Sequence, residues 1–340
     1  MMVKKRITSV DVAREASVSQ STVSRVLSGN GRFTPQTKER VLSAAYKLGY
    51  KPNALARSLT TQRSNLVGIV MADITNPFYP NVLEKFTLRF QELDKQVLLF
   101  HVPPNGDVDD ILPRALQYQM EAMIIASATI SSEIANECAR QGMTVILFNR
   151  YALDSAVSAV SCDNLRGGEM VADYLLNLGK QRLAFIAGNE NTSTNIDREK
   201  GFRNRLQAHG ITQYQREPGT YSFQSGFDAA IRLLNQDNPP DAIFCANDII
   251  AMGCMDAARF ELGMRIPDEL CVVGFDDIPA CRRPSYALTT IRQPVSKMID
   301  TTIALLNERT KAPGMPPVLR LEPGRLIERA STRRLEQEVG

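Results

Sequence analysis

The apolar positions of this 340-residue chain follow two different patterns. Up to residue 63, small and branched apolar residues recur at helical spacing in three short segments. From residue 64 onward, runs of four to six mostly apolar residues alternate with longer amphipathic segments. Because a single core usually takes about 100–200 residues, length and pattern together predict a small helical unit followed by a larger α/β unit.

Each short segment of the first unit places its apolar residues on one helical face. They are Val12, Ala13 and Ala16 in the first segment, Val23, Val26 and Leu27 in the second, and Val41, Ala44, Ala45 and Leu48 in the third. Ser19 is a suitable N-cap for the second helix, and Thr34 followed by Pro35 is a typical start for the third. Only the link from Ala16 to Ser19 separates the first two helices, which predicts a helix-turn-helix.

The second helix of such a motif lies in the major groove of DNA, with its N-terminal residues against the base edges. Here those residues are polar and able to hydrogen-bond to bases or phosphates: Gln20, Ser21, Thr22, Ser24 and Arg25. Taken alone, a short run of Ser, Thr and Gln is more typical of a solvated helix face. The surrounding pattern favours DNA recognition.

Charge is distributed unevenly along the chain. Residues 1–63 contain twelve Lys and Arg against three acidic residues, a net charge of +9, which leaves 28 basic and 34 acidic residues, a net charge of −6, for the remainder. A basic head on an acidic body indicates a protein that meets a polyanion at one end. A membrane-binding segment would need a bulky apolar face, which this head lacks, so we expect double-stranded DNA as a partner and no membrane.

The apolar runs of the body fall into two series. The first comprises residues 66–71, 97–100, 123–126 and 145–148, and the second residues 182–187, 242–245 and 271–275. Such runs, separated by amphipathic helices, predict parallel sheets covered by helices on both faces. Two series predict two similar lobes.

Ligands of parallel α/β sheets bind beyond the carboxyl ends of the strands, so the residues just after each run are candidates for a cleft between the lobes. These are Asp73 with Phe78, Ala126, Asn149 with Arg150, Asn247 with Asp248, and Asp276 with Asp277. Polar side chains in these positions suit a hydroxyl-rich solute. For Asp248 and Asp277, capping of the next helix is an equally good interpretation.

Two strings of the head are distinctive: residues 7–29, ITSVDVAREASVSQSTVSRVLSG, and residues 49–53, GYKPN. Both resemble the head of the LacI/GalR family of bacterial repressors. Its core motifs are matched by residues 73–79, 198–202, 246–248, 273–277 and 288–294, so the likeness covers nearly the whole chain. One departure is Ser17, where the family more often has Gly; a left-handed backbone there would cost about 1 kcal/mol.

The resemblance implies an α/β fold with a three-helix helix-turn-helix head and a hinge helix, followed by a doubly wound, parallel-sheet domain of two lobes like a periplasmic binding protein. The implied boundaries are 1–52 for the head, 53–63 for the hinge, and 64–340 for the effector-binding and dimerisation domain, with lobe 1 at 64–162 plus 293–327 and lobe 2 at 163–292. The chain would cross between lobes near Ser161–Asn164 and Ile291–Pro294.

The resemblance also implies two sets of contact residues. Those expected at DNA are Thr8, Ser19, Gln20, Ser21, Thr22, Ser24, Arg25, Asn53, Ala56, Arg57 and Leu59. In the family the leucine that Leu59 matches is a minor-groove wedge, although a plain linker is the alternative. Those expected at the effector are Asp73, Phe78, Asn149, Arg150, Arg198, Tyr221, Asn247, Asp276 and Gln293.

Arg150 bears on the class of effector. Together with Arg198 it would bring two guanidinium groups to one ligand, an arrangement that suits a carboxylate or phosphate. A sugar acid or sugar phosphate is therefore slightly favoured over a neutral sugar, unless Arg150 points to solvent.

Two rival functions receive little support. An enzyme needs chemistry, but the chain has only His101 and His209 and neither a GxSxG nor an HExxH pattern, so we expect no catalytic residue, metal or cofactor. The six cysteines form no CxxC pair and are interpreted as reduced core thiols. A periplasmic sugar-binding protein would have the same lobes, but with an export signal in place of the basic head.

Assembly and location follow from the same features. The first six residues lead directly into polar sequence without an apolar signal core, which favours the cytoplasm. A single helix-turn-helix reads only a half-site, so we expect a homodimer on a near-palindromic operator. Residues 328–340 lack sustained heptads, which argues against a tetramer formed by the tail.

Overall fold

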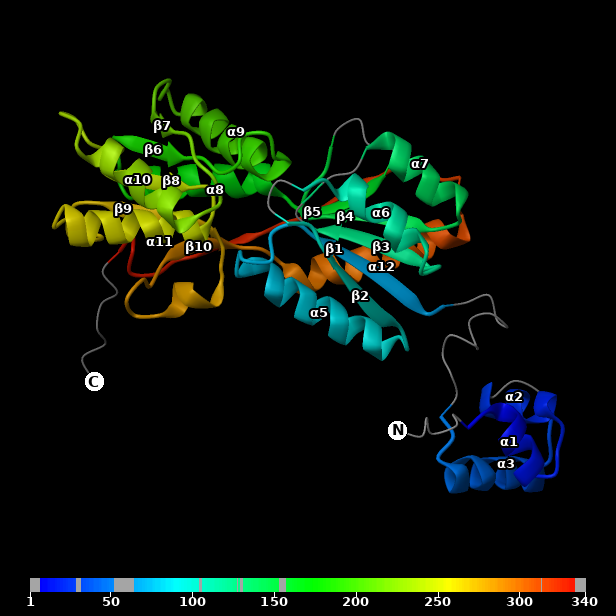
Figure 1. Ribbon diagram of the computed structural model, residues 1–340. Coiled ribbons are helices and arrows are strands. Elements are labelled where there is room, and N and C mark those ends of the chain that lie inside the picture. The colour runs from blue at the N-terminus through cyan, green and yellow to red at the C-terminus, as the bar shows by residue number, and fades with distance from the viewer. Residues whose placement is uncertain are drawn as a thin grey trace. The chain divides into compact units, whose positions relative to one another are not determined.

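The structure is a computed structural model, and its chain divides into two compact units, Met1–Asn65 and Leu66–Gly340 (Figure 1). Each unit is described by itself. The described residues are 7–28, 32–51, 64–103, 106–126, 128, 131–152, 157–312 and 314–333.

The first unit is a bundle of three short helices around a small core. Its helices are α1 (Ser9–Glu15), α2 (Gln20–Ser28) and α3 (Pro35–Leu48). The core contains Val12, Ala13, Ala16, Val23, Val26, Val41, Ala44 and Ala45, with Leu27 and Leu48 packed against it. All ten apolar positions expected from helical spacing therefore face this core, and the predicted helix-turn-helix is confirmed.

The helix ends of this unit have specific caps. Thr8 and Asp11 form a capping box at the start of α1, and the Thr34 hydroxyl accepts a hydrogen bond from the Thr37 N–H at 3.3 Å at the start of α3. Gly49, with φ of 64°, ends α3. Ser17 has φ of 51°, so it does adopt the left-handed backbone that costs a non-glycine residue about 1 kcal/mol.

The first lobe of the second unit is a six-stranded, wholly parallel sheet with strand order β11-β5-β4-β3-β1-β2. Its strands are β1 (Leu66–Met71), β2 (Gln96–His101), β3 (Ala122–Ala126), β4 (Thr144–Phe148), β5 (Ser158–Cys162) and β11 (Leu319–Glu322). Helices α6 (Val108–Leu116) and α7 (Ser132–Arg140) cover one face. Helices α5 (Phe78–Glu92) and α12 (Val295–Lys311) cover the other (Figure 1).

The second lobe has the strand order β12-β10-β9-β8-β6-β7. Its strands are β6 (Leu183–Ile186), β7 (Gln215–Glu217), β8 (Ala242–Cys245), β9 (Cys271–Asp276), β10 (Thr289–Arg292) and β12 (Arg325–Ile327), and only β12 pairs antiparallel to its neighbour. Its helical elements are α8 (Asn164–Asn177), α9 (Ser193–Ala208), α10 (Phe223–Leu234), α11 (Asp248–Asp256), the π-helical η1 (Ala257–Glu261) and the 3-10 turn η2 (Pro279–Arg282). Glycine allows α8 and α9 to lie close, because a Cβ on Gly201 would come within 1.9 Å of the Leu165 carbonyl oxygen.

The chain passes between the two sheets three times: after β5, after β10, and between β11 and β12. Residues 293–327 were expected in the first lobe, but the strand pairing places Arg325–Ile327 in the second sheet, beside β10. The residues that follow stay there, since the Ser331 hydroxyl donates to the Val272 carbonyl at 2.6 Å and accepts from the Thr289 N–H at 2.8 Å. The overall fold class, a helical head followed by two parallel-sheet lobes, is confirmed.

Candidate functional site

The N-terminal part of α2 presents polar side chains to solvent. Gln20, Ser21, Ser24 and Arg25 are exposed and Thr22 is half-buried, while the apolar residues of α2 face the core of the unit. The helix is therefore oriented so that its polar residues are available to a partner, as a DNA-reading helix requires.

Two of the residues expected at DNA serve as helix caps in this structure. The Ser19 hydroxyl accepts a hydrogen bond from the Thr22 N–H at 3.2 Å, and the Thr8 hydroxyl donates to Asp11 at 2.7 Å. Gln20 donates through Nε2 to the Ser9 hydroxyl at 3.2 Å, which joins α2 to α1. The four expected contacts between Asn53 and Leu59 lie outside the described residues.

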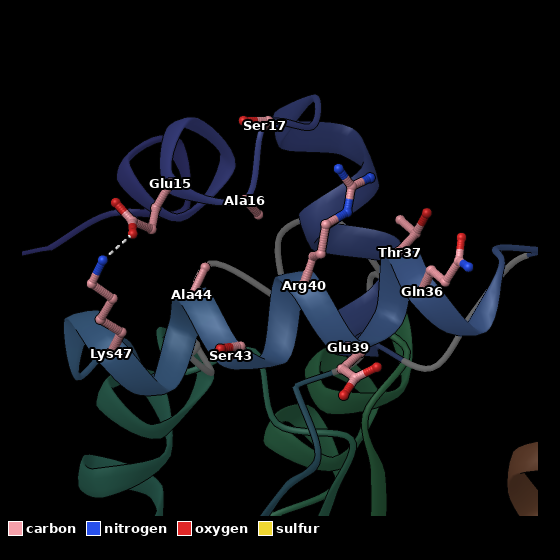
Figure 2. Close-up of a pocket in the computed structure, with 10 residues that line it drawn as sticks. All are labelled: Glu15, Ala16, Ser17, Gln36, Thr37, Glu39, Arg40, Ser43, Ala44 and Lys47. Carbon is pink, nitrogen blue, oxygen red and sulfur yellow. Dashed lines mark hydrogen bonds and ion pairs between the residues drawn. The ribbon is translucent and has the colours of Figure 1, made fainter.

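A hollow of about 850 Å³ lies between the end of α1 and α3 in the same unit (Figure 2). An ion pair closes one end of it, with Lys47 Nζ 2.5 Å from Glu15 Oε1. Its lining comes from α1, the turn at Ser17 and α3, without a described residue of α2. This hollow is therefore distinct from the exposed polar face of α2.

A second cavity lies between the two lobes, at the carboxyl ends of both sheets. It is lined by Asn76, Phe78, Tyr79, Asn149, Arg150, Thr194, Arg198, Tyr221, Asn247 and Asp276. Seven of the nine residues expected at the effector are in this lining, all except Asp73 and Gln293. The remaining volume is about 10 Å³, barely the space of one water molecule, so the lobes are closed over the cavity.

Arg198 is held in the cavity by hydrogen bonds, an ion pair and an aromatic ring. Its Nε donates to Asn164 Oδ1 at 2.8 Å and its Nη1 to the Ala246 carbonyl at 2.6 Å. Its Nη2 lies 3.3 Å from Asp276 Oδ1, and the guanidinium carbon lies 3.7 Å from the centre of the Phe275 ring. Each guanidinium nitrogen already has a protein partner, so the orientation of Arg198 is fixed before a ligand binds.

Asp276 is held from two sides. Gln293 donates to its Oδ1 at 2.7 Å in addition to Arg198, so Gln293 supports the cavity from behind although it does not line it. Burial raises the pKa of Asp276 to about 6, against the opposing effect of Arg198. Asp73 likewise acts from outside the lining: its carboxylate accepts from the Asn76 N–H at 3.3 Å and orders the turn that leads to Phe78.

Arg150 is half-buried and lines the cavity. Its guanidinium carbon lies 5.8 Å from the centre of the Tyr221 ring, within the range of a cation–π contact. The Tyr221 hydroxyl is in turn hydrogen-bonded to the Thr194 hydroxyl at 2.9 Å. Gly188 leaves room for this ring, because a Cβ there would lie 2.3 Å from it. The half-buried Arg150 side chain therefore lines the cavity beside Tyr221.

Three buried polar atoms at or behind the cavity have no hydrogen-bond partner among the described residues: Asn149 Oδ1, Asn247 Nδ2 and Gln293 Oε1. Asn247 uses its Oδ1 to cap α11, accepting from the Ile250 N–H at 3.0 Å, and Asn149 uses its Nδ2 to donate to the Tyr79 hydroxyl at 3.2 Å. Asn149 Oδ1 and Asn247 Nδ2 are therefore available to hydrogen-bond with a ligand. Leaving such atoms unpaired costs about 1–3 kcal/mol each, which a polar ligand would offset.

Neither the strand ends nor the family resemblance indicated Asn76, Tyr79 and Thr194, which line the cavity from the turn before α5 and from the first turns of α5 and α9. The strand-end residues also include two aspartates with other roles. Asp248 is buried behind the cavity and accepts from Thr290 at 2.6 Å, while Asp277 binds Arg329 at 2.6 Å. Neither lines the cavity, and Asn247 rather than Asp248 is the N-cap of α11.

Metal-ligating clusters and membrane-spanning helices are both missing from the described ranges. These ranges contain no group of three or more His, Cys, Asp or Glu side chains placed to hold a metal ion. Within the same ranges, no helix is both long and apolar enough to cross a membrane. The six cysteines are all buried and unpaired.

A helix-turn-helix head joined to two parallel-sheet lobes with a cavity between them defines a DNA-binding regulator with a ligand-binding domain. Comparison with known proteins agrees. Residues 8–53 match the model of bacterial regulatory proteins of the lacI family, and residues 172–332 match a periplasmic binding protein-like domain. The chain is 33% identical over 304 residues to the HTH-type transcriptional regulator GalS of Salmonella typhimurium, covering 88% of this chain and 89% of GalS.

Solved structures show the same likeness. The Lac repressor dimer bound to operator and the anti-inducer ONPF matches with a TM-score of 0.87 at 25% identity, over 96% of this chain and 99% of that one. The transcriptional regulator CelR in complex with cellobiose matches with a TM-score of 0.71 at 26% identity, over 96% and 100%. The chain belongs to the lacI family of bacterial regulatory proteins. It is a sequence-specific, DNA-binding transcriptional regulator.

Proposed function

We propose that the chain is a repressor whose affinity for its operator is set by a hydroxyl-rich, anionic small molecule bound in the interlobe cavity. The observation that carries this proposal is the set of unpaired buried amide atoms around the Arg198–Asp276 pair. Such atoms favour a ligand with several hydrogen-bonding groups over an apolar one.

The polar groups of the second lobe suit vicinal hydroxyls. The Asp276 carboxylate is an acceptor for a hydroxyl donor, and the Asn247 amide N–H is a donor for a neighbouring oxygen. Phe78 and Tyr221 add aromatic surface for the apolar face of a sugar ring. The cellobiose complex of the structurally similar CelR supports a carbohydrate-like ligand.

The anionic group is expected beside Arg150. The charged residues of the lining are Arg150, Arg198 and Asp276, a net charge of +1. Because Asp276 offsets the charge of Arg198, the preference for a carboxylate or phosphate rests on Arg150 alone and no longer on a pair of guanidinium groups. A sugar acid or sugar phosphate remains the favoured class.

The head would read the operator through Gln20, Ser21, Thr22, Ser24 and Arg25, with Ser19 and Thr8 positioned as caps beside them. Two heads are needed for a near-palindromic site, and the operator complex of the Lac repressor dimer supports a homodimer. We expect the protein to act in the cytoplasm, where the bacterial chromosome lies. A regulatory rather than enzymatic role is supported by its relatives.

A thermal-shift series on the full chain tests the ligand class. The probes are D-glucose, D-glucuronate and D-glucose 6-phosphate, together with D-galactose and its uronate and 6-phosphate, so that each neutral sugar has acidic counterparts. A ligand at about 100 times its Kd stabilises the folded state by about 2.7 kcal/mol, a rise in melting temperature of several degrees.

We expect an acidic member to give the largest shift, and Arg150→Met to reduce it towards that of the neutral sugar. Arg203→Met, which changes an exposed arginine on α9, is the matched control and should keep the parent's response. The proposal is wrong if the neutral sugars give the larger shifts, or if none of the six probes stabilises the protein.

A further inference from the structure

Tyr151 contacts both lobes. It follows β4 of the first lobe, and its ring packs against the apolar cluster that includes Val145 and Leu147. Its hydroxyl donates to Asp197 Oδ2 at 2.5 Å, and its backbone N–H donates to the Ser193 hydroxyl at 3.0 Å. Both acceptors lie on α9 of the second lobe. We refer to Tyr151, Ser193 and Asp197 as the interlobe contact.

The interlobe contact is adjacent in sequence to the cavity on both sides. Arg150 precedes Tyr151, Thr194 follows Ser193, and Arg198 follows Asp197, and these three neighbours line the cavity. Arg150 is joined to Tyr151 by a peptide bond, and Thr194 and Arg198 belong to α9. Separating Tyr151 from α9 would therefore also move Arg150 away from Thr194 and Arg198. Closure of the lobes and the geometry of the cavity are thus linked through covalent neighbours.

The hydrogen bond to Asp197 has the features of a strong one. Tyr151 is partly shielded from water, and burial raises both its pKa and that of Asp197 above their ordinary values. Hydrogen bonds to a charged acceptor in such surroundings are stronger than those between neutral groups. None of the three residues lines the cavity, so the contact does not depend on a ligand for its partners.

We propose that Tyr151 is a positioning residue that holds the two lobes closed without an effector and so keeps Arg150 in place over the cavity. The part of this inference that concerns Arg150 rests on the proposed function of the cavity. Lobe closure itself can be measured without any ligand, so a failure of the ligand assignment and a failure of this inference are distinguishable.

The test is a distance measurement on the full-length protein with one spin label on each lobe. Asn136→Cys on α7 and Gln207→Cys on α9 are exposed label sites, and the six native cysteines are buried. Labelled protein is mixed with an excess of unlabelled protein so that only distances within one chain are observed. The unsubstituted parent, treated with the same label, gives the background.

Three variants are compared with the parent at neutral pH without sugar. Tyr151→Phe removes only the hydroxyl, and Ser193→Ala removes the second hydrogen bond. Tyr214→Phe is the matched control, because the Tyr214 hydroxyl donates to Glu199 on the same helix at 2.9 Å, but within the second lobe. Thermal unfolding monitored by circular dichroism shows that each variant is folded.

We expect one short distance in the parent and in Tyr214→Phe. In Tyr151→Phe the ratio of closed to open molecules should fall roughly ten- to a hundredfold, and Ser193→Ala should shift it in the same direction by less. The inference is overturned if the parent is already mainly open, if Tyr151→Phe and Ser193→Ala both retain the parent distribution, or if Tyr214→Phe opens the lobes equally.

Discussion

Arg198 Nη2 lies 3.3 Å from Asp276 Oδ1, and the two side chains are only 2% and 5% exposed. A pair buried to this degree is held in place by its partners, which here include Asn164, the Ala246 carbonyl and Gln293. The pair is therefore both the charged centre of the cavity and part of the framework of the second lobe.

This double role changes what a substitution does. Arg198→Met leaves the Asp276 carboxylate buried without its cation, which should lower the free energy of unfolding by about 3–5 kcal/mol. The double variant Arg198→Met/Asp276→Asn should recover part of that loss. Urea unfolding of the parent, Arg198→Met, Asp276→Asn and the double variant measures these differences, with Arg203→Met as control. Equal stability of the parent and Arg198→Met would contradict the framework role.

Asp248 gives the stability a pH dependence. It is fully buried behind the cavity, and burial together with the nearby Asp276 charge raises its pKa to about 8. Its folded-state pKa thus exceeds the unfolded value, so between about pH 4 and pH 8 the folded state binds the extra proton and stability falls as pH rises.

The substitution Asp248→Asn removes the carboxyl group that binds this proton. The parent should lose up to about 1.4 kcal/mol of unfolding free energy per pH unit through Asp248 in that interval, and the variant should lose correspondingly less. Urea unfolding at a series of pH values measures the slope. Asp228→Asn, at an exposed site, should keep the parent's slope; an unchanged slope in Asp248→Asn would show that Asp248 does not titrate there.

The head separates residues that read bases from residues that position the protein. Gln20→Ala or Ser21→Ala should change the preferred bases, with a free-energy difference of roughly 1–3 kcal/mol for each hydrogen bond to a base that the substitution removes. Lys4→Ala and Lys5→Ala, at positions outside the described residues, should weaken all sequences alike. Selection from randomised operators distinguishes these effects, and an unchanged preference in both α2 variants would exclude α2 as the recognition helix.

Ser331 stabilises the second lobe from the end of the chain. Its hydroxyl is fully buried and bonded to Thr289 and Val272. Ser331→Ala leaves the Thr289 N–H without that partner and should lower the unfolding free energy by about 1–3 kcal/mol. Ser296→Ala, at an exposed site, should change it by less than about 0.5 kcal/mol. Thermal unfolding of both variants and the parent measures these differences. Equal melting temperatures of Ser331→Ala and the parent would contradict this role of Ser331.

The sequence predicted the parts of the fold that depend on local periodicity. The ten apolar positions of the head all pack in its core, and the run at residues 145–148 falls within β4. Strand β7 escaped prediction because its three residues, Gln215, Arg216 and Glu217, are polar and lie at a sheet edge. Strand β12 was assigned to the wrong lobe because strand pairing is a long-range property that no local pattern encodes.

The cavity, too, could be predicted only as far as local sequence patterns allow. Strand ends located half of its lining, since parallel strands bring their carboxyl ends to one edge, and the family resemblance added Arg198 and Tyr221. The strand ends could not show that Asp248 faces Thr290 and Ile278 instead of the cavity, because that depends on the packing of β10 and η2. Nor could they show that Thr8 and Ser19 serve as caps, since a polar residue before a helix suits either capping or DNA contact equally well.

The central claim is that ligand binding in the cavity changes the affinity of the head for its operator. It is tested most directly by titrating a selected operator with the full chain, with and without a saturating amount of the sugar probe that stabilises it most. Coupling of this kind is typically 1–3 kcal/mol, so the operator Kd should change about five- to 150-fold. An operator Kd that is identical with and without the bound sugar would contradict the account.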